Sequence, residues 1–329
     1  MSAPRQQRLR LGAIVILAAA IAASPIAPAL AAADVHVNVT FDESAGQNPE
    51  GMALDRTGDV FVSVSPLGDV WKIPARSTTP EPFGHVNGIV PGRDFGLLGL
   101  AVDVFGNVYG AVQSADPAAN GVWRFDRRTG DATRLPGTAA MGIPNGLAFD
   151  HVGNLYATDS AAGAIWRIPW GGTAAVWAQD VALTGDGSLG LGVPLGANGI
   201  AFRNRLLTVT NTERRTILAI PTSDPSSIHV VTTLGGNPDG VAMDVHGNAY
   251  VAINLEDTIA RVSPSGSVNV VASGDPLDFP SSVAFGTAHG GRRTLFGVNF
   301  SIGEIFGLPP GFGPAAFTID VGVPGSPVP

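Results

Sequence analysis

One short pattern occurs six times in this chain of 329 residues and constrains its fold more than any other feature. In its clearest copy, at residues 237–250, Asn-Pro-Asp-Gly leads into alternating small and apolar residues, an Asp-x-x-Gly-Asn turn and a second β-rich run. The residue before the repeated glycine marks each copy, and these markers, spaced 41 to 53 residues apart, are Glu50, Leu98, Asn145, Asn198, Asp239 and Ser281. A repeat of this length, in a chain rich in Gly and Pro, predicts an all-β, six-bladed β-propeller with four-stranded blades.

Two other repeat architectures fit the sequence less well. A β-helix has a shorter period, and a helical solenoid needs amphipathic helices, which are missing after the N-terminal region. Two strand-like segments near the chain ends, at residues 36–41 and 316–321, are also present. We expect one of them to complete the last blade by pairing with the other end of the chain, because this pairing removes an exposed sheet edge.

The first 33 residues differ from the rest of the chain. Three arginines precede an apolar run, and prolines and an alanine-rich stretch follow it, which predicts a secretory signal peptide at residues 1–33. The unbroken apolar run is shorter than the roughly 18–20 residues of a membrane span, so we expect no stable span after cleavage. Residues 34–329 are predicted to form a single propeller domain outside the cytoplasm, either secreted or on the exterior of the cell envelope.

The composition excludes several classes of partner. There is no cysteine, so the fold rests on its core and on ring closure without disulfides. The formal net charge is −8, and it becomes more negative when the arginines of the signal peptide are removed. Such an acidic surface disfavours nucleic acid and anionic membranes as partners. We expect a monomer that acts on a small molecule.

The marker column carries the main prediction of a site. In a propeller, the innermost strands surround one axis, so the markers are expected to converge at one mouth of the central channel. Four of the six bear side-chain oxygens that suit a hard cation, namely Glu50, Asn145, Asn198 and Asp239. All-oxygen ligation favours Ca²⁺, with Mg²⁺ or another divalent cation as the alternative. The competing interpretation is that Asn-Gly and Asp-Gly are ordinary hairpin turns.

Polar residues also recur at two other positions of the repeat. Asp159, Asn211 and Asn299 fall at the end of the second strand of their blades, where they orient the metal ligands, contact a substrate, or are solvated strand ends. The repeated Asp-x-x-Gly turns lie at the opposite end of the inner strand. Their loops are far shorter than a twelve-residue calcium loop, so we interpret these aspartates as turn residues.

The repeats resemble those of the senescence marker protein/gluconolactonase (regucalcin-like) family and of its calcium-dependent relatives, diisopropyl fluorophosphatase and the paraoxonases. The resemblance covers about residues 35–311 and is carried by the Glu-Gly, Asn-Gly, Asn-Gly and Asp-Gly pairs at the four markers. It implies that these four residues hold a catalytic divalent ion at the mouth of the channel. The chain departs from gluconolactonases at Ile143, where they place an arginine, and from paraoxonases in lacking a clear histidine pair. His85 and His289 are the histidines that could reach the mouth.

These features predict a secreted, calcium-dependent hydrolase of the lactonase or esterase type. Asp239 is the candidate general base or nucleophile, and Glu50, grouped with it as catalytic, acts chiefly as a ligand. Phe95, Phe279, Trp170 and the loop at residues 183–195 are expected to form apolar walls at the mouth. The alternative function is a non-catalytic extracellular propeller that binds protein or glycan through its loop face. A lyase on a related propeller is a weaker candidate, since no supporting catalytic pair is apparent.

Overall fold

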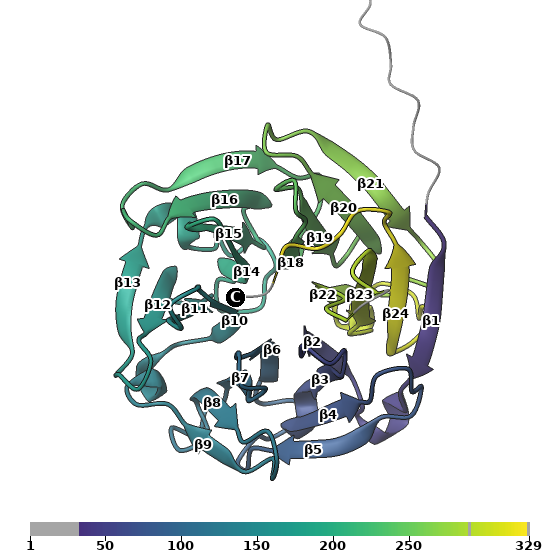
Figure 1. Ribbon diagram of the computed structural model, residues 1–329, viewed down its shortest axis with the longest axis horizontal. Coiled ribbons are helices and arrows are strands. Elements are labelled where there is room, and N and C mark those ends of the chain that lie inside the picture. Colours follow the sequence, from purple (N-terminus) through teal and green to yellow (C-terminus); the bar gives the residue numbers. More distant parts are fainter. Residues whose placement is uncertain (1–32, 289–290, 328–329) are drawn as a thin grey trace, which may run out of the picture. The chain divides into compact units, whose positions relative to one another are not determined.

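The computed structural model describes residues 33–288 and 291–327, and these residues form a six-bladed β-propeller (Figure 1). Each blade is an antiparallel sheet of four strands, as the repeat predicted. The first strand of each blade lies nearest the axis, and the later strands lie progressively closer to the rim (Figure 1). The predicted fold class is therefore confirmed.

Five blades follow the chain order, and the sixth combines both ends of the chain. The first three blades contain β2 (Pro49–Leu54), β3 (Val60–Val64), β4 (Asp69–Ile73), β5 (Glu81–His85); β6 (Gly96–Val102), β7 (Val108–Gln113), β8 (Gly121–Phe125), β9 (Ala132–Arg134); and β10 (Pro144–Phe149), β11 (Leu155–Asp159), β12 (Ala164–Ile168), β13 (Ala175–Gln179). The others contain β14 (Ala197–Arg203), β15 (Leu206–Asn211), β16 (Thr216–Pro221), β17 (His229–Thr233); β18 (Pro238–Met243), β19 (Ala249–Ile253), β20 (Thr258–Val262), β21 (Val268–Ser273); and β22 (Pro280–Phe285), β23 (Thr294–Asn299), β24 (Ala315–Asp320), β1 (Val35–Thr40).

The ring closes through β1 and β24, which pair antiparallel from Val35 opposite Ile319 to Thr40 opposite Ala315. Both predicted terminal strands are thus present, and they pair with each other within the last blade. Residues 1–32 of the predicted signal peptide lie outside the described residues. Ala33 already donates its backbone N–H to the carbonyl of Val271 at 2.8 Å.

The repeated aspartates cap their own turns, as their sequence context predicted. The Asp103 carboxylate accepts hydrogen bonds from the backbone N–H groups of Phe105 and Asn107, both at 2.9 Å. Asp244 accepts from the backbone N–H groups of His246 and Asn248 in the same way. Because these oxygens are used by local N–H groups, they fix the end of the inner strand and set where the second strand begins.

Apolar side chains fill the space between neighbouring blades. Tyr109 of blade two and Phe149 of blade three form an edge-to-face pair with ring centroids 5.0 Å apart, and Tyr250 and Phe285 join blades five and six in the same way at 5.2 Å. Burying one such large side chain contributes roughly 1.5–3 kcal/mol. The interfaces between blades, rather than a single central core, therefore carry most of the hydrophobic burial.

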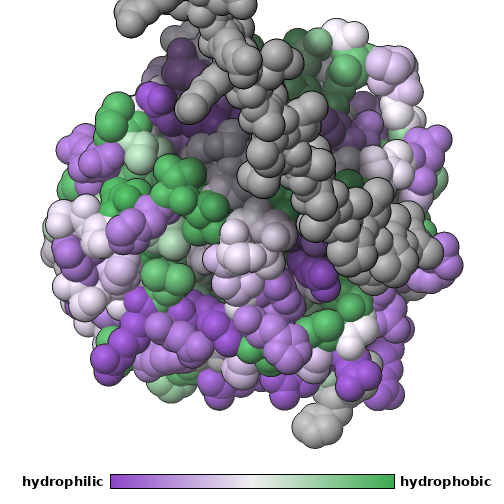
Figure 2. Space-filling view, turned by 90° about the horizontal axis from the view of Figure 1, so that it is seen from above, coloured by the Kyte–Doolittle hydropathy of each residue, from purple (hydrophilic) through white to green (hydrophobic). Residues whose placement is uncertain are grey.

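The outside of the propeller is mixed in polarity. Figure 2 shows one side of the molecule, on which hydrophobic and hydrophilic residues are interspersed. Exposed valines such as Val176, Val230 and Val270 lie on outermost strands of different blades. The helices of the described part are 3-10 turns of three or four residues, and none of them could cross a membrane: η1 (Glu43–Ala45), η2 (Ser65–Leu67), η3 (Thr138–Ala140), η4 (Val181–Leu183) and η5 (Gly303–Phe306).

The repeated glycines are explained by the packing of the inner strands around the axis. A Cβ built on Gly99 would lie 2.6 Å from the carbonyl oxygen of Asn145 in the next blade, and one on Gly240 would lie 2.6 Å from that of Ser281. Gly51, Gly146 and Gly199 meet the marker carbonyl of the next blade in the same manner. The markers and their glycines lie inside strands and not in hairpin turns, so the turn interpretation of this column is wrong.

Replacing Gly99 with alanine should therefore destabilise the ring. Its new methyl group would meet backbone atoms of blade three, which cannot move without shifting the neighbouring strand. We expect Gly99→Ala to lower the free energy of unfolding by about 1–3 kcal/mol, the usual range for overpacking. Gly235→Ala is the matched control, because a Cβ there meets no atom within 4 Å. Equal melting temperatures for the two variants would contradict this account.

Candidate metal site on the propeller axis

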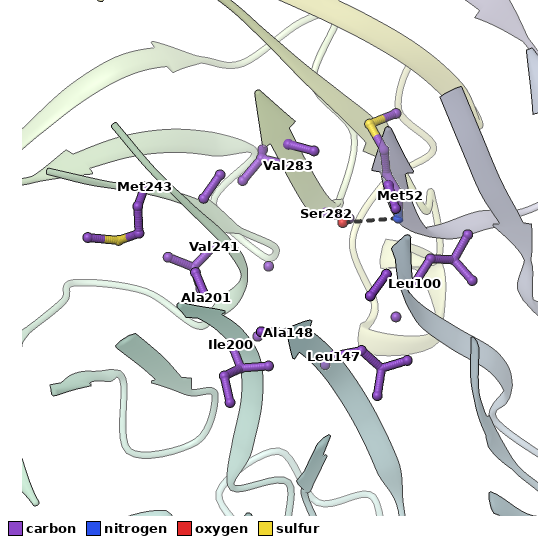
Figure 3. A pocket seen from close by; sticks show the side chains of 18 of the residues that line it. Met52, Leu100, Leu147, Ala148, Ile200, Ala201, Val241, Met243, Ser282 and Val283 are labelled. Atoms are coloured by element: carbon purple, nitrogen blue, oxygen red, sulfur yellow. Dashed lines mark hydrogen bonds between the residues drawn. The ribbon is translucent and has the colours of Figure 1, made fainter. Parts of the chain in front are cut away.

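The four oxygen-bearing markers lie around one cavity on the axis. Glu50, Asn145, Asn198 and Asp239 belong to β2, β10, β14 and β18, and all four line a central cavity of about 200 Å³. Each is buried, with 6–8% of its surface exposed. Most of the remaining lining residues belong to the inner strands, and many of them are apolar, including Met52, Leu100 and Val241 (Figure 3). The structure thus brings four side chains from four blades to one place.

A repeated irregularity in the inner strands determines where the markers lie. In β2, Pro49 pairs with Val64 but Met52 pairs with Val62, so three steps along β2 match two along β3. The same shift surrounds the marker of β10, between Pro144 and Leu147. Bulges of this kind bend a strand and redirect a side chain. All six inner strands carry such a shift.

Three of the four markers are held by a side chain from the end of the second strand of their own blade. The Asn145 Nδ2 donates to Ser160 Oγ at 3.3 Å, and the Asn198 Nδ2 donates to Thr212 Oγ1 at 2.9 Å. Asn254 Nδ2 donates to Asp239 Oδ2 at 2.8 Å. We call Ser160, Thr212 and Asn254 the bridging residues. Within the described part of the chain, no such hydrogen bond reaches the carboxylate of Glu50.

The two remaining markers have structural contacts. The Ser281 hydroxyl donates to the carbonyl oxygen of Glu50 at 2.7 Å, which ties blade six to blade one at the axis. Leu98 is buried, with 4% of its surface exposed. Neither residue contributes an acidic oxygen, so the donor set remains two carboxylates and two amides.

The two carboxylates are in an unfavourable electrostatic setting. Burial raises the pKa of Glu50 well above its usual value, and the nearby charge of Asp239 raises it further. Burial also raises the pKa of Asp239 to about 7, although hydrogen bonds from Asn254 and Asn198 act in the opposite direction. Two buried acids that face one cavity are stabilised by protons or by a cation.

The donor set fits a divalent cation of the calcium type. Calcium takes 6–8 oxygen ligands, and carboxylate and amide oxygens are both typical of its sites. Among the described residues, no group of three or more His, Cys, Asp or Glu side chains is placed to hold a metal ion. The four markers are a different kind of set, because half of their donors are neutral amides.

The second predicted column lies next to the site, but its hydrogen bonds go elsewhere. The Asp159 carboxylate accepts from the backbone N–H groups of Gly142 and Ile143 at 2.8 and 2.9 Å. Asn211 donates to the carbonyls of Ala182 and Thr184, and Asn299 donates to that of Pro276. These side chains anchor loops. Within the described residues, no hydrogen bond joins Asp159, Asn211 or Asn299 to the four markers.

The second predicted column lies one position before the bridging residues, and for this reason the bridging residues were missed in the sequence. Ser160 follows Asp159, Thr212 follows Asn211 and Asn254 follows Ile253. Successive side chains of an extended segment point in opposite directions, so one step changes a loop anchor into a contact with a marker. A polar residue in this column of five blades, Ser65, Gln113, Ser160, Thr212 and Asn254, was the available signal.

Part of the predicted mouth was placed wrongly. The ring of Trp170 packs against Phe105 with centroids 5.5 Å apart, and Phe105 belongs to the turn after β6, at the far end of the inner strand. Trp170 therefore lies on the face opposite the markers. His85 pairs with Asp69 at 2.7 Å on the outer strands of blade one, away from the axis. His289 lies outside the described residues.

Comparisons with known proteins agree with the predicted resemblance. A family model described as SMP-30/gluconolactonase/LRE-like region matches residues 193–296, a range that includes Asn198 and Asp239. The predicted resemblance to this family is confirmed over this part of the chain. A comparison with curated proteins finds no match.

Solved structures share the fold at low sequence identity. A candidate gluconolactonase superposes with a TM-score of 0.65 at 15% identity, covering 90% of this chain and 95% of the other. Regucalcin from Agrobacterium tumefaciens, described as a calcium-binding protein, gives 0.64 at 17% identity and covers 91% and 99%. A catalytically inactive histidine-to-alanine variant of virginiamycin B lyase from Staphylococcus aureus gives 0.54 at 16% identity and covers 80% and 81%. Among the described residues that line the central cavity here, none is a histidine.

The raised pKa values predict how pH affects the stability of the metal-free protein. Asp239 titrates near 3.8 in an unfolded chain and near 7 when folded, so between these values the folded protein binds more protons. Stability must then fall as pH rises through that window, by on the order of 1 kcal/mol per pKa unit. We expect the melting temperature of chelator-treated protein to fall between pH 4.5 and 7.5, and more steeply than that of Asp239→Asn. Parallel curves for the two proteins would contradict the assigned electrostatics.

Proposed function

We propose that this protein is a secreted, calcium-dependent hydrolase of the lactonase or esterase type that acts on a small molecule. The observation that carries the proposal is the convergence of two buried carboxylates and two amides, from four blades, on one cavity. The family match supports the reaction class. Secretion rests on the predicted signal peptide, and calcium on the chemistry of the donor set.

The markers would have different roles in the reaction. When bound, a divalent cation supplies Lewis-acid polarisation of the substrate carbonyl. Glu50, Asn145, Asn198 and Asp239 would serve as its ligands. Asn254 donates to Asp239 Oδ2, so Oδ1 is the atom that would face the cation and take a proton from the attacking water. Asp239 as a direct nucleophile is the alternative for the same atom.

The loop before β10 indicates the type of substrate. Ile143 stands where the related gluconolactonases place an arginine, and it is buried with 4% of its surface exposed. Its backbone N–H and that of Gly142 are fixed by the Asp159 carboxylate, so the loop has a defined position. Because isoleucine supplies no positive charge at this position, we favour an uncharged or apolar ester or lactone over a sugar-acid lactone.

A non-catalytic binding role is the second candidate, and one observation favours it. On the face opposite the markers, Phe105 and Trp170 expose 57% and 58% of their surface beside the exposed Arg127 and Arg128. Exposed aromatic and arginine side chains are enriched at protein-binding sites. This candidate predicts metal binding without turnover.

Two measurements separate these functions. Melting curves with and without chelator test the metal, and a panel of lactones and aryl esters tests turnover. The proposed hydrolase should lose stability and all turnover on chelation, and regain both with calcium. An unchanged melting temperature would count against the metal site, while calcium binding without turnover of any substrate would favour the binding role.

Asp239→Asn tests the assigned base once a substrate is found. The amide keeps the shape of the side chain and its place beside Asn254, but it cannot take a proton. We expect kcat to fall by about 100-fold or more with the fold intact, within the usual range for a general base. Asp34→Asn is the control, because Asp34 is exposed and immediately precedes β1, the outermost strand of its blade. Normal turnover in Asp239→Asn would remove this residue from its role.

A further inference from the structure

The bridging residues make a second contact that links each blade to the next. Thr212 Oγ1 accepts from the Asn198 amide of its own blade and donates to the carbonyl of Pro238 at 2.8 Å. Pro238 immediately precedes the marker Asp239. Ser160 Oγ likewise accepts from Asn145 and donates to the carbonyl of Ala197 at 2.7 Å, next to Asn198.

The chain of contacts continues to the end of the ring. Asn254 Nδ2 donates to Asp239 Oδ2 and also to the carbonyl of Pro280 at 3.2 Å, beside the marker Ser281. The Ser281 hydroxyl then donates to the carbonyl of Glu50. Hydrogen bonds therefore run from the marker of blade three through those of blades four, five and six to the marker of blade one.

These contacts determine which way the two amides face. A hydroxyl group has a single proton, and that of Thr212 is given to the Pro238 carbonyl. Thr212 can then only accept from Asn198, so the group that faces it must be the amide NH₂. The carbonyl oxygen of the amide is turned the other way. The same reasoning applies to Ser160 and Asn145.

We infer that Ser160, Thr212 and Asn254 are positioning residues that present the oxygens of Asn145, Asn198 and Asp239 to a divalent cation. The inference rests on the proposed metal site. Each bridging residue holds the nitrogen or one oxygen of its marker, and it makes no hydrogen bond to the remaining side-chain oxygen of that marker. Because the ligands are oriented before the ion binds, the bridging residues raise calcium affinity without touching the ion.

Thr212→Val tests this role, because valine keeps the shape of threonine and removes both hydrogen bonds. Thr210→Val is the matched control: the Thr210 hydroxyl also links blades four and five, by donating to the Asp239 carbonyl at 2.6 Å, but it touches no marker side chain. Calcium dissociation constants of chelator-treated protein are measured by titration calorimetry. We expect about 10-fold weaker binding or more for Thr212→Val, a change within about two-fold for Thr210→Val, and recovery in Thr212→Ser.

Ser160→Ala and Thr158→Val form a second pair for use if Thr212→Val fails to fold. The Thr158 hydroxyl donates to the Asn198 carbonyl and contacts no marker side chain. Equal losses of affinity in a variant and its control, or no loss in either bridging variant, would overturn the inference, as would wild-type protein that binds no calcium. Normal calcium binding by wild-type protein without hydrolysis would instead count against the proposed function alone.

Discussion

The structure depends on how closely the six inner strands approach one another at the axis. At five of the six positions, the carbonyl of a marker occupies the space that the preceding blade would need for a Cβ, and this explains the glycines there. The same approach places the marker side chains around one cavity. A single packing constraint thus accounts for the glycine, which is the most constant residue of the repeat. It also accounts for the convergence of the marker side chains, which vary between blades.

Concentrating carboxylates at that point has an electrostatic cost. Glu50 and Asp239 are both buried, and both have raised pKa values in the metal-free protein. The surrounding hydrogen bonds orient Asp239 but provide no positive charge. An ion that binds only the folded state stabilises it by about 2.7 kcal/mol when present at 100 times its dissociation constant. The site and the stability of the ring are therefore coupled through the same two residues.

The sequence was sufficient to predict the six blades, the inner strands and closure by the terminal strands, because these follow from the period of the repeat and from the need to remove a free edge. It also identified Glu50, Asn145, Asn198 and Asp239 as a converging set. It did not place Trp170 on the correct face, because the face on which a loop lies depends on how many strands of the blade precede that loop. The bridging residues were missed by one position, since alternation along an extended segment changes a side chain's partner completely at each step.

A crystal structure of the protein grown or soaked with calcium tests the central claim most directly. The account predicts density for one ion on the propeller axis, with side-chain oxygens of Glu50, Asn145, Asn198 and Asp239 at about 2.3–2.6 Å and further ligands from water. Calcium bound elsewhere, or an axis without an ion at millimolar calcium, would contradict it.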